Sequence, residues 1–254
     1  APDLNVYCES VHYYRRDVSK SQLFKSIPYI VSSRSSEDLI LNLLQDDYPV
    51  LLEGLHTCNL LNDQRLNGRR IVVRMHNIEH DYYNHLAMVE TDLFKKYYYH
   101  NEAKKLQRFE RVLKKASALL AISRKDELYF SAKYRNVSFI PAFHPHTEVK
   151  TQSGHGDYVL YHGNLSVSEN KNAIKFLLES VFNDLEIPFV VAGLNPSPAV
   201  RKMIEAMPFV QLVANPDDEE MFRLVNEAQL NILVTFQATG LKLKLLNTLY
   251  NGRF

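Results

Sequence analysis

The fold is decided by one stretch near the end of the chain, Ile232-Leu-Val-Thr-Phe-Gln-Ala-Thr-Gly-Leu-Lys-Leu-Lys-Leu-Leu-Asn-Thr-Leu-Tyr-Asn-Gly252. A short β-rich run leads through a polar loop into a helical pattern that starts near Gly240 and stops at Gly252. At about 100° per residue, Lys244, Asn247 and Asn251 share one face, and leucines fill the opposite arc. The pattern predicts a polar stripe on an otherwise buried helix.

The start of this helix has the features of an anion site. Its first N–H groups and the helix dipole favour a negative charge, Gly240 lets a phosphate approach the backbone, and Lys244 adds a cation one turn later. The stretch therefore predicts a diphosphate site. The alternative is a helix whose first lysines are merely solvated.

The rest of the chain repeats the same alternation of short apolar runs and longer helical patterns. This rhythm predicts α/β units on parallel sheets, in which ligands bind beyond the carboxyl ends of the strands. The expected strands are Leu4–Cys8, Val50–Glu53, Arg70–Met75, Ala118–Ala121, Val137–Ile140, Tyr158–His162, Phe189–Ala192, Val210–Val213 and Ile232–Val234.

A segment rich in Pro, Gly and His, 141–156, marks a domain boundary. We expect two doubly wound domains, 1–145 and 146–254. The first half is expected to begin at an inner strand, and the second ends as a further strand would start. We therefore expect elements to be missing at both ends of an incomplete chain.

Composition is that of an ordinary soluble globular protein. The chain has 254 residues, of which 46% are hydrophobic, and a formal net charge of +1. Its two cysteines, Cys8 and Cys58, are too few for a disulfide framework, which favours the reducing cytoplasm. No apolar run reaches the roughly 20 residues that span a bilayer.

Several motifs together resemble the GT-B glycosyltransferases of glycosyltransferase family 4, the bacterial group 1 type. The donor-site helix of that family is similar to residues 235–254, with a glycine turn, a basic residue, a leucine-rich stretch and a Gly-Arg stop. Tyr158–Asn170, Val190–Pro196 and Asn215–Met221 look like its C-domain loops. Arg74–Tyr83 and Phe109–Asp126 resemble its N-domain motifs.

The resemblance implies two Rossmann-like domains that face a cleft, with the acceptor on the first and a nucleotide-sugar donor on the second. It places Gly163 and Asn164 at the donor phosphates and Gly193 and Asn195 at the nucleotide. It assigns the diphosphate to a set in the last motif: Thr239, Gly240, Lys242 and Lys244.

This chain departs from the family at two points. Thr239 and Asn247 stand where many members carry two glutamates, so Asn247 replaces the usual ribose-binding carboxylate with an amide. No arginine follows Gly163. Asn164 and Asn170 can donate hydrogen bonds there but carry no charge, which leaves Lys242 and Lys244 to offset the diphosphate.

The run His76-Asn-Ile-Glu-His80 permits three interpretations. It matches the H-x-x-E-H pattern of zinc peptidases, but the preceding run reads as a strand, which places His76 in a loop and His80 on a helix. Under the glycosyltransferase interpretation His76, Asn77 and Glu79 are catalytic and contact the acceptor or the transferred sugar. The third interpretation is a capping Asn77 beside a core His76.

The segment Asp92–Lys115 holds eight basic and three acidic residues with aromatic residues between them. This pattern is open to an anionic membrane surface, to nucleic acid or to a solvated helix. We expect no nucleic-acid partner, and a peripheral contact at the inner membrane face if the acceptor is lipid-linked. His144 and His146 are expected in a simple linker.

The expected reaction is transfer of a hexosyl group from a nucleotide-diphosphate sugar to a saccharide or lipid-linked acceptor in bacterial polysaccharide biosynthesis. The resemblance implies retention. No Asp-x-Asp motif is present to hold a divalent cation, so we expect no metal and no cofactor beyond the co-substrate. The alternatives are an inactive GT-B-derived binding module and a zinc hydrolase that uses His76, Glu79 and His80.

Overall fold

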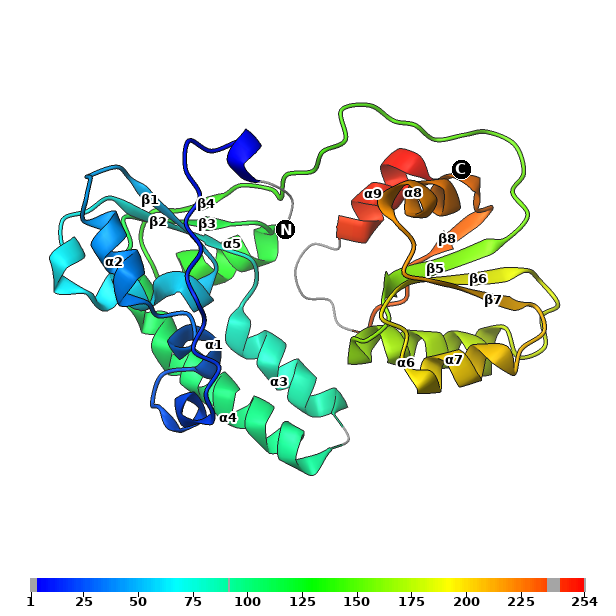
Figure 1. Cartoon of the computed structure of the whole chain (residues 1–254), viewed down its shortest axis with the longest axis horizontal. Coiled ribbons are helices and arrows are strands. Elements are labelled where there is room, and N and C mark those ends of the chain that lie inside the picture. The colour runs from blue at the N-terminus through cyan, green and yellow to red at the C-terminus, as the bar shows by residue number, and fades with distance from the viewer. Residues whose placement is uncertain (1–3, 91, 237–242, 254) are drawn as a thin grey trace. The chain divides into compact units, whose positions relative to one another are not determined.

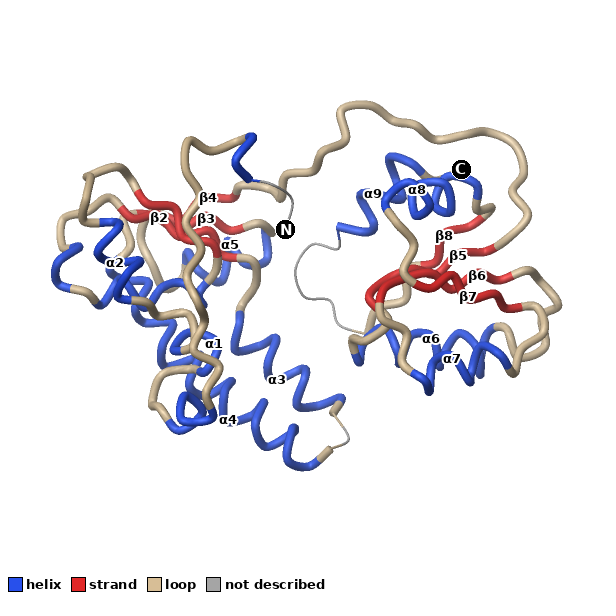
Figure 2. Tube along the Cα trace, viewed as in Figure 1, coloured by secondary structure: helices blue, strands red, loops and turns tan. Residues whose placement is uncertain are grey.

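The computed structural model describes residues 4–90, 92–236 and 243–253 (Figure 1). These residues form two compact units, one that runs to Ala142 and one that starts at Phe143. Within the described ranges, each unit holds a four-stranded parallel sheet with helices packed on it (Figure 2). The predicted fold class, two Rossmann-like α/β domains, is confirmed.

The first unit orders its strands β1-β2-β3-β4 along the sheet, the same order as in the sequence. The strands are β1 Val50–Glu53, β2 Ile71–Met75, β3 Ala118–Ala121 and β4 Val137–Phe139. The α-helices are α1 Tyr29–Ser32, α2 Glu37–Leu43, α3 Glu79–Val89, α4 Leu93–Phe109 and α5 Arg124–Ser131. Short 3-10 helices cover Leu4–Val6, Lys20–Phe24, Leu55–Asn62, Gln64–Leu66 and Glu110–Lys115.

The core of the first unit is one apolar cluster. Strand β2 alternates buried and half-buried positions and sends Ile71, Val73 and Met75 into it. Leu106 from α4 and Phe130 from α5 reach the same cluster. Helices α3 and α4 form a long antiparallel hairpin, and their joined ends lie away from the sheet (Figure 1).

The second unit orders its strands β7-β6-β5-β8, so the two central strands are buried on both faces. The strands are β5 Val159–Asn164, β6 Phe189–Leu194, β7 Val210–Ala214 and β8 Leu230–Ile232. The helices are α6 Ser168–Phe176, which continues into a π-turn Leu177–Val181, then α7 Pro198–Glu205, α8 Asp218–Glu227 and α9 Leu243–Asn251.

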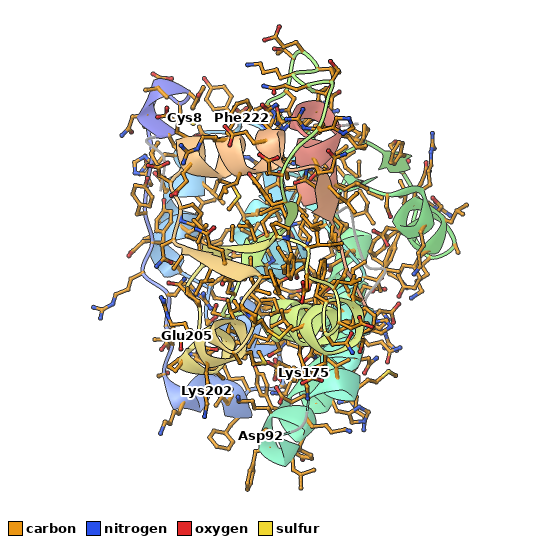
Figure 3. All side chains as sticks on the ribbon, turned by 90° about the vertical axis from the view of Figure 1, so that its right-hand side faces the viewer. Cys8, Asp92, Lys175, Lys202, Glu205 and Phe222 are labelled. Atoms are coloured by element: carbon orange, nitrogen blue, oxygen red, sulfur yellow. The ribbon has the colours of Figure 1, made fainter. Side chains whose placement is uncertain are left out.

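Helices cover both faces of this second sheet (Figure 1). Tyr161 and Val191 pack with residues of α6 and α7 on one face, and Leu160 and Val190 pack with Val225 of α8 on the other. Both α6 and α7 are amphipathic. Lys175, Lys202 and Glu205 project from their outer sides (Figure 3), and the buried sides contribute to the core.

Local sequence signals set where the helices begin. Ser197 caps α7 by accepting from the Val200 N–H, with Pro198 as the first helical residue. Asp217 caps α8 at 2.8 Å from the Glu220 N–H, and three acidic residues follow in the first turn. Both caps come directly after loops that follow a strand, so they fix the carboxyl edge of the sheet.

Two predictions about strands are wrong. Leu4–Cys8 is no strand, because Leu4–Val6 form a 3-10 helix whose apolar side chains are exposed and pair with no sheet. The last strand, β8, ends at Ile232 instead of starting there.

In the described ranges, no helix is both long and apolar enough to cross a bilayer.

Candidate functional site

The carboxyl edge of the second sheet brings several predicted donor residues together. Gly163 of β5 pairs with Gly193 of β6 in the parallel ladder. Gly193 has φ +152°, and a Cβ there would lie 1.7 Å from the Gly163 carbonyl oxygen. Only glycine fits this position, so the two strands approach closely where the sheet ends.

The turn after β5 is held by amides. The Asn164 carboxamide oxygen accepts from the backbone N–H of Ser166 at 3.0 Å and from its hydroxyl at 2.7 Å. Asn170 donates to the Asn164 carbonyl at 2.9 Å and accepts from the Tyr161 hydroxyl at 2.9 Å. Asn164 and Asn170 therefore both lie at the carboxyl edge of the second sheet, as predicted. Their hydrogen bonds within the chain fix the conformation of the turn after β5.

Helix α6 begins beside Gly163 without a side-chain cap from the described residues, since its N-cap is Val167. A hydrogen bond joins its first turn to the segment that follows β8, because the Thr235 hydroxyl donates to the Glu169 carboxylate at 2.8 Å. An uncapped helix N-terminus next to a glycine pair at the carboxyl end of parallel strands is a favourable place for an anion.

Lys244 supplies a cation at this edge. Its Nζ lies 5.0 Å from the centroid of the Tyr161 ring, within cation–π range. Burial and the nearby Lys244 charge lower the pKa of His162 to about 4. The lysine of α9 therefore lies close to the end of β5, where the diphosphate was predicted.

Asn195 ends β6 in a left-handed conformation, with φ 55°, and its N–H donates to the Asn215 carboxamide at 2.8 Å. The ends of β6 and β7 are thus joined by an asparagine pair. Thr239, Gly240 and Lys242, the remaining predicted diphosphate residues, lie outside the described residues.

The prediction that the leucines of α9 are its buried face is wrong, because the polar stripe of the helix faces inward. Asn251 is buried and donates to the Asn247 carboxamide at 2.8 Å, whereas Leu245 and Leu249 on the predicted buried arc are exposed. Leu241, on the same arc, is outside the described residues. Asn247 and Asn251 line a groove of about 470 Å³ with residues of α8 and of 145–150.

The segment 143–150 is more than a simple linker, because it packs on α9. The His146 ring stacks on Tyr250 at 5.1 Å between centroids, and His144 lies 4.8 Å from the same ring. The Lys150 N–H donates to the Tyr250 carbonyl at 2.7 Å. These contacts fix the last turn of α9 within the second unit.

The carboxyl edge of the first sheet carries the predicted catalytic residues. His76 and Asn77 lie in the short loop between β2 and α3, and Glu79 is the first residue of α3. The His76 Nε2 lies 2.6 Å from the Glu53 carboxylate at the end of β1, and Arg74 pairs with the same carboxylate at 3.3 Å. Asn77 does not cap α3, whose N-cap is Ile78.

Glu79 is buried beside this pair. Burial raises its pKa to about 7, although the nearby His76 and Arg34 favour the charged form. Within the described residues its carboxyl group has no hydrogen bond. A carboxyl group that changes charge near neutral pH is suited to accept or donate a proton.

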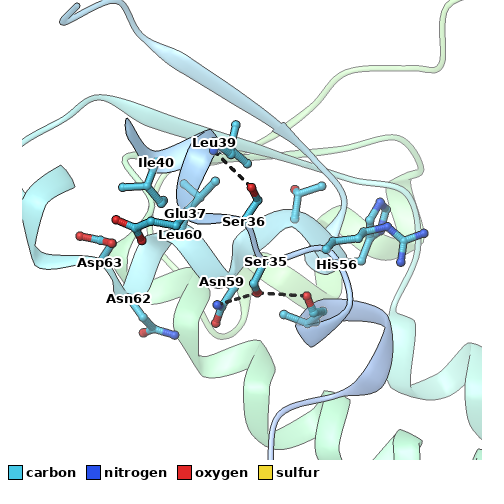
Figure 4. A pocket seen from close by; sticks show the side chains of 13 residues that line it. Ser35, Ser36, Glu37, Leu39, Ile40, His56, Asn59, Leu60, Asn62 and Asp63 are labelled. Carbon is cyan, nitrogen blue, oxygen red and sulfur yellow. Dashed lines mark hydrogen bonds between the residues drawn. The ribbon is translucent and has the colours of Figure 1, made fainter. Parts of the chain in front are cut away.

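A cavity of about 350 Å³ opens beside these residues (Figure 4). His56, whose ring centroid lies 6.5 Å from that of His76, stands at one end of it, and Arg34 also lines it. Burial, Arg34 and His76 lower the pKa of His56 to about 4. The other lining residues are mixed, with hydroxyl and amide groups beside apolar side chains such as Leu39 and the carboxylates of Glu37 and Asp63. The Asn59 amide donates to the Ser35 hydroxyl at 2.8 Å.

No family model matches this chain. An uncharacterized 44.6 kDa protein in the cps region of Klebsiella pneumoniae is 26% identical over 262 residues, which is 97% of this chain and 67% of that protein.

Solved structures share the fold. TarM aligns with a TM-score of 0.59 at 14% identity over 82% of this chain, and the trehalose 6-phosphate synthase of Burkholderia multivorans with 0.51 at 8% over 88%. The fold is of the GT-B type. The chain spans 41% of the TarM chain and 62% of the synthase chain.

The two histidines of the H-x-x-E-H pattern lie on different elements and have different carboxylate partners. His80 lies on α3, as predicted, and its Nδ1 is 3.2 Å from the buried Glu110, far along the chain from the His76 partner Glu53. Within the described ranges, no three His, Cys, Asp or Glu side chains converge as metal ligands. The pattern therefore does not form the helical metal site of a zinc peptidase.

Three residues near the carboxyl ends of strands were not predicted from the sequence: Glu53 and His56 in the first unit and His162 in the second. Glu53 ends the strand Val50–Glu53 and His56 follows it, so the rule that function lies beyond strand ends could have found them. His162 lies within a predicted strand. It is buried, and its Nε2 has no hydrogen-bond partner among the described residues. A histidine inside an apolar strand was the available signal.

The raised pKa of Glu79 predicts that the free energy of unfolding decreases as pH rises. The folded state binds its proton up to about pH 7 and the unfolded state only to about 4.5, so stability falls as pH rises between these values. At roughly 1.4 kcal/mol per pKa unit, the cost above pH 7 is about 3 kcal/mol. Glu79→Gln should therefore gain stability relative to the native protein across this window, as measured by urea unfolding at several pH values.

A difference between Glu79→Gln and the native protein that stays constant from pH 4.5 to 7 would contradict this prediction. It would show that burial does not raise the pKa of Glu79.

Proposed function

We propose that the protein is a glycosyltransferase that takes its sugar from a nucleotide-diphosphate donor. The observation that carries this proposal is the carboxyl edge of the second sheet, where Gly163, Gly193, the start of α6 and Lys244 lie together. A variant of S. aureus TarM, similar in fold at a TM-score of 0.51 and 12% identity over 74% of this chain and 36% of its own, was crystallised with UDP. That complex supports a nucleotide diphosphate as the ligand.

In this proposal the second unit stabilises the leaving diphosphate. The first N–H groups of α6 and the Lys244 ammonium are positive where negative charge grows on the leaving oxygens. Gly163 and Gly193 carry no side chain that would keep a phosphate from the strand ends. Thr239, Gly240 and Lys242 remain predicted partners of the same group.

The nucleoside is proposed to occupy the neighbourhood of Asn195 and Asn247. The Asn247 carboxamide already accepts from Asn251, so its NH₂ group is the part left to meet a ribose oxygen. A carboxylate at this position would accept from both ribose hydroxyls. We therefore expect weaker discrimination of the ribose hydroxyls than a glutamate gives.

The first unit is proposed to bind the acceptor. His76, held by Glu53, and Glu79 with its pKa near 7 can exchange a proton with an acceptor hydroxyl. The cavity beside His56 is lined by Ser35, Asn59 and Asn62, whose hydrogen-bonding groups suit a saccharide. Transfer of a hexosyl group with retention and without a metal ion remains the predicted course.

The Klebsiella relative, described by its place in the cps region, supports a role in bacterial polysaccharide biosynthesis. A cytoplasmic location remains a prediction. The competing proposal is a GT-B-derived module that binds a nucleotide sugar without turnover.

The test is a panel of UDP-, GDP- and ADP-sugars, each assayed for thermal stabilisation and for release of the free nucleoside diphosphate. We expect one donor class to stabilise the protein and to be turned over. Saturable stabilisation without release would favour the binding module, and no response to any donor would contradict both proposals.

A further inference from the structure

We propose that the tip of the α3–α4 hairpin and the outer face of α4 form a docking surface for an anionic lipid membrane. The tip is the last turn of α3 and the first turn of α4, which meet at the end of the hairpin away from the sheet (Figure 1). This inference is independent of the donor site.

The tip exposes large apolar side chains that the fold of the first unit does not cover. Met88 is 73% exposed, Leu93 78%, Phe94 89% and Tyr97 75%. Single exposed apolar residues are common on soluble proteins, but four within ten residues at one protruding end form a patch. An exposed apolar patch of this kind marks a site at which another surface binds and removes it from water.

The outer face of α4 continues this patch as a basic stripe. At about 100° per residue, Leu93, Tyr97, His100, Lys104 and Arg108 fall within an arc of roughly 80°. All five are exposed. The opposite side of the helix is buried, with Glu102, Ala103, Leu106 and Phe109 facing the core.

Charge complementarity selects an anionic partner. The exposed charges on α4 are Lys95, Lys96, Lys104 and Arg108, all positive. The one acidic residue of the helix, Glu102, is buried, pairs with Lys105 at 2.9 Å and accepts from the Tyr29 N–H at 2.6 Å. Asp92, labelled at the tip in Figure 3, accepts from the N–H groups of Phe94 and Lys95 as the cap of the helix.

Lipid fits this surface better than nucleic acid does. Aliphatic Met88 and Leu93 can enter the boundary between headgroups and acyl chains, where they gain as much as in a core, and lysines beside them attract anionic headgroups. Single-stranded nucleic acid is bound mainly by aromatic rings that stack on its bases, whereas two of the four exposed side chains here, Met88 and Leu93, are aliphatic. The surface therefore predicts insertion at the tip and headgroup contacts along the stripe.

The test is sedimentation of the full chain with vesicles of phosphatidylcholine alone and with added phosphatidylglycerol. We expect binding to the phosphatidylglycerol vesicles that weakens as salt rises. Leu93→Ser with Phe94→Ser should reduce the partition coefficient by about tenfold or more, as should Lys104→Glu with Arg108→Glu.

Two matched controls test the location. Leu128→Ser removes an apolar side chain of 73% exposure on α5, and Lys202→Glu reverses an exposed charge on α7. Both should bind like the native protein. Because every altered side chain is exposed, folding should persist, and circular dichroism checks this.

Equal sedimentation with both kinds of vesicle would overturn the proposal, as would tip variants that bind like the native protein. A concentration-dependent dimer in sedimentation velocity that Phe94→Ser abolishes would also overturn it, since the patch would then be a contact between copies of the chain.

Discussion

Lys244→Ala is expected to lower kcat/KM with the preferred donor by about 100-fold or more, the range seen when one group that stabilises a leaving oxyanion is removed. Lys244 lies over the ring of Tyr161 in β5, and the diphosphate is proposed to leave at the carboxyl end of this strand. Steady-state kinetics with the donor found in the panel measures the loss. Lys244→Arg, which keeps the charge, should retain a large part of the activity.

The titration of His162 tests the position of Lys244 independently of activity. Because its charge contributes to the low pKa of His162, Lys244→Ala should raise that pKa above about 4, as followed by the histidine ring protons in NMR titration. Lys202→Ala, on the outer side of α7 (Figure 3), should change neither kcat/KM nor the His162 titration. Full activity of Lys244→Ala would contradict the assignment of Lys244 to the donor site.

Gly193→Ala is expected to destabilise the second unit by about 3 kcal/mol or more, through backbone strain and overpacking together. The new Cβ would lie 1.7 Å from the Gly163 carbonyl oxygen, so the β5–β6 pairing must open for it to fit. Hydrogen exchange along β5 and β6 during urea unfolding measures the effect.

The matched control is Gly68→Ala. Gly68 also has a positive φ, +87°, but no atom lies within 4 Å of an added Cβ. It should cost only the backbone strain, about 1–2 kcal/mol, and leave exchange in β5 and β6 unchanged. Equal costs for the two substitutions would mean that the close approach of the two glycine strands does not hold the donor edge.

The sheets were largely predictable because apolar runs bounded by polar loops locate parallel strands. Val50–Glu53 and Ala118–Ala121 match their strands residue for residue. Leu4–Cys8 has the same composition as a strand, but pairing depends on a partner that composition does not reveal. The leucines of α9 were predicted as buried for a similar reason, since periodicity identifies two faces and not which of them meets the sheet.

The candidate site was predictable only in part. The resemblance to glycosyltransferase family 4 pointed to Gly163, Asn164 and Gly193, and the rule that ligands bind beyond strand ends agrees with it. The partners that tune the site come from distant parts of the chain. Glu53 meets His76 across neighbouring strands, and Lys244 of α9 lowers the pKa of His162 in β5. Such pairings follow from strand order, which the sequence pattern leaves open.

The most direct measurement of the donor site is an amide chemical-shift titration of the ¹⁵N-labelled chain with UDP, GDP and ADP. The proposed diphosphate site predicts saturable shifts from one of them that are largest at Gly163, Asn164, Glu169 and Asn170, and that Lys244→Ala weakens. Shifts centred on His56, His76 and Glu79 of the first unit, or no saturable shift with any nucleotide, would contradict it.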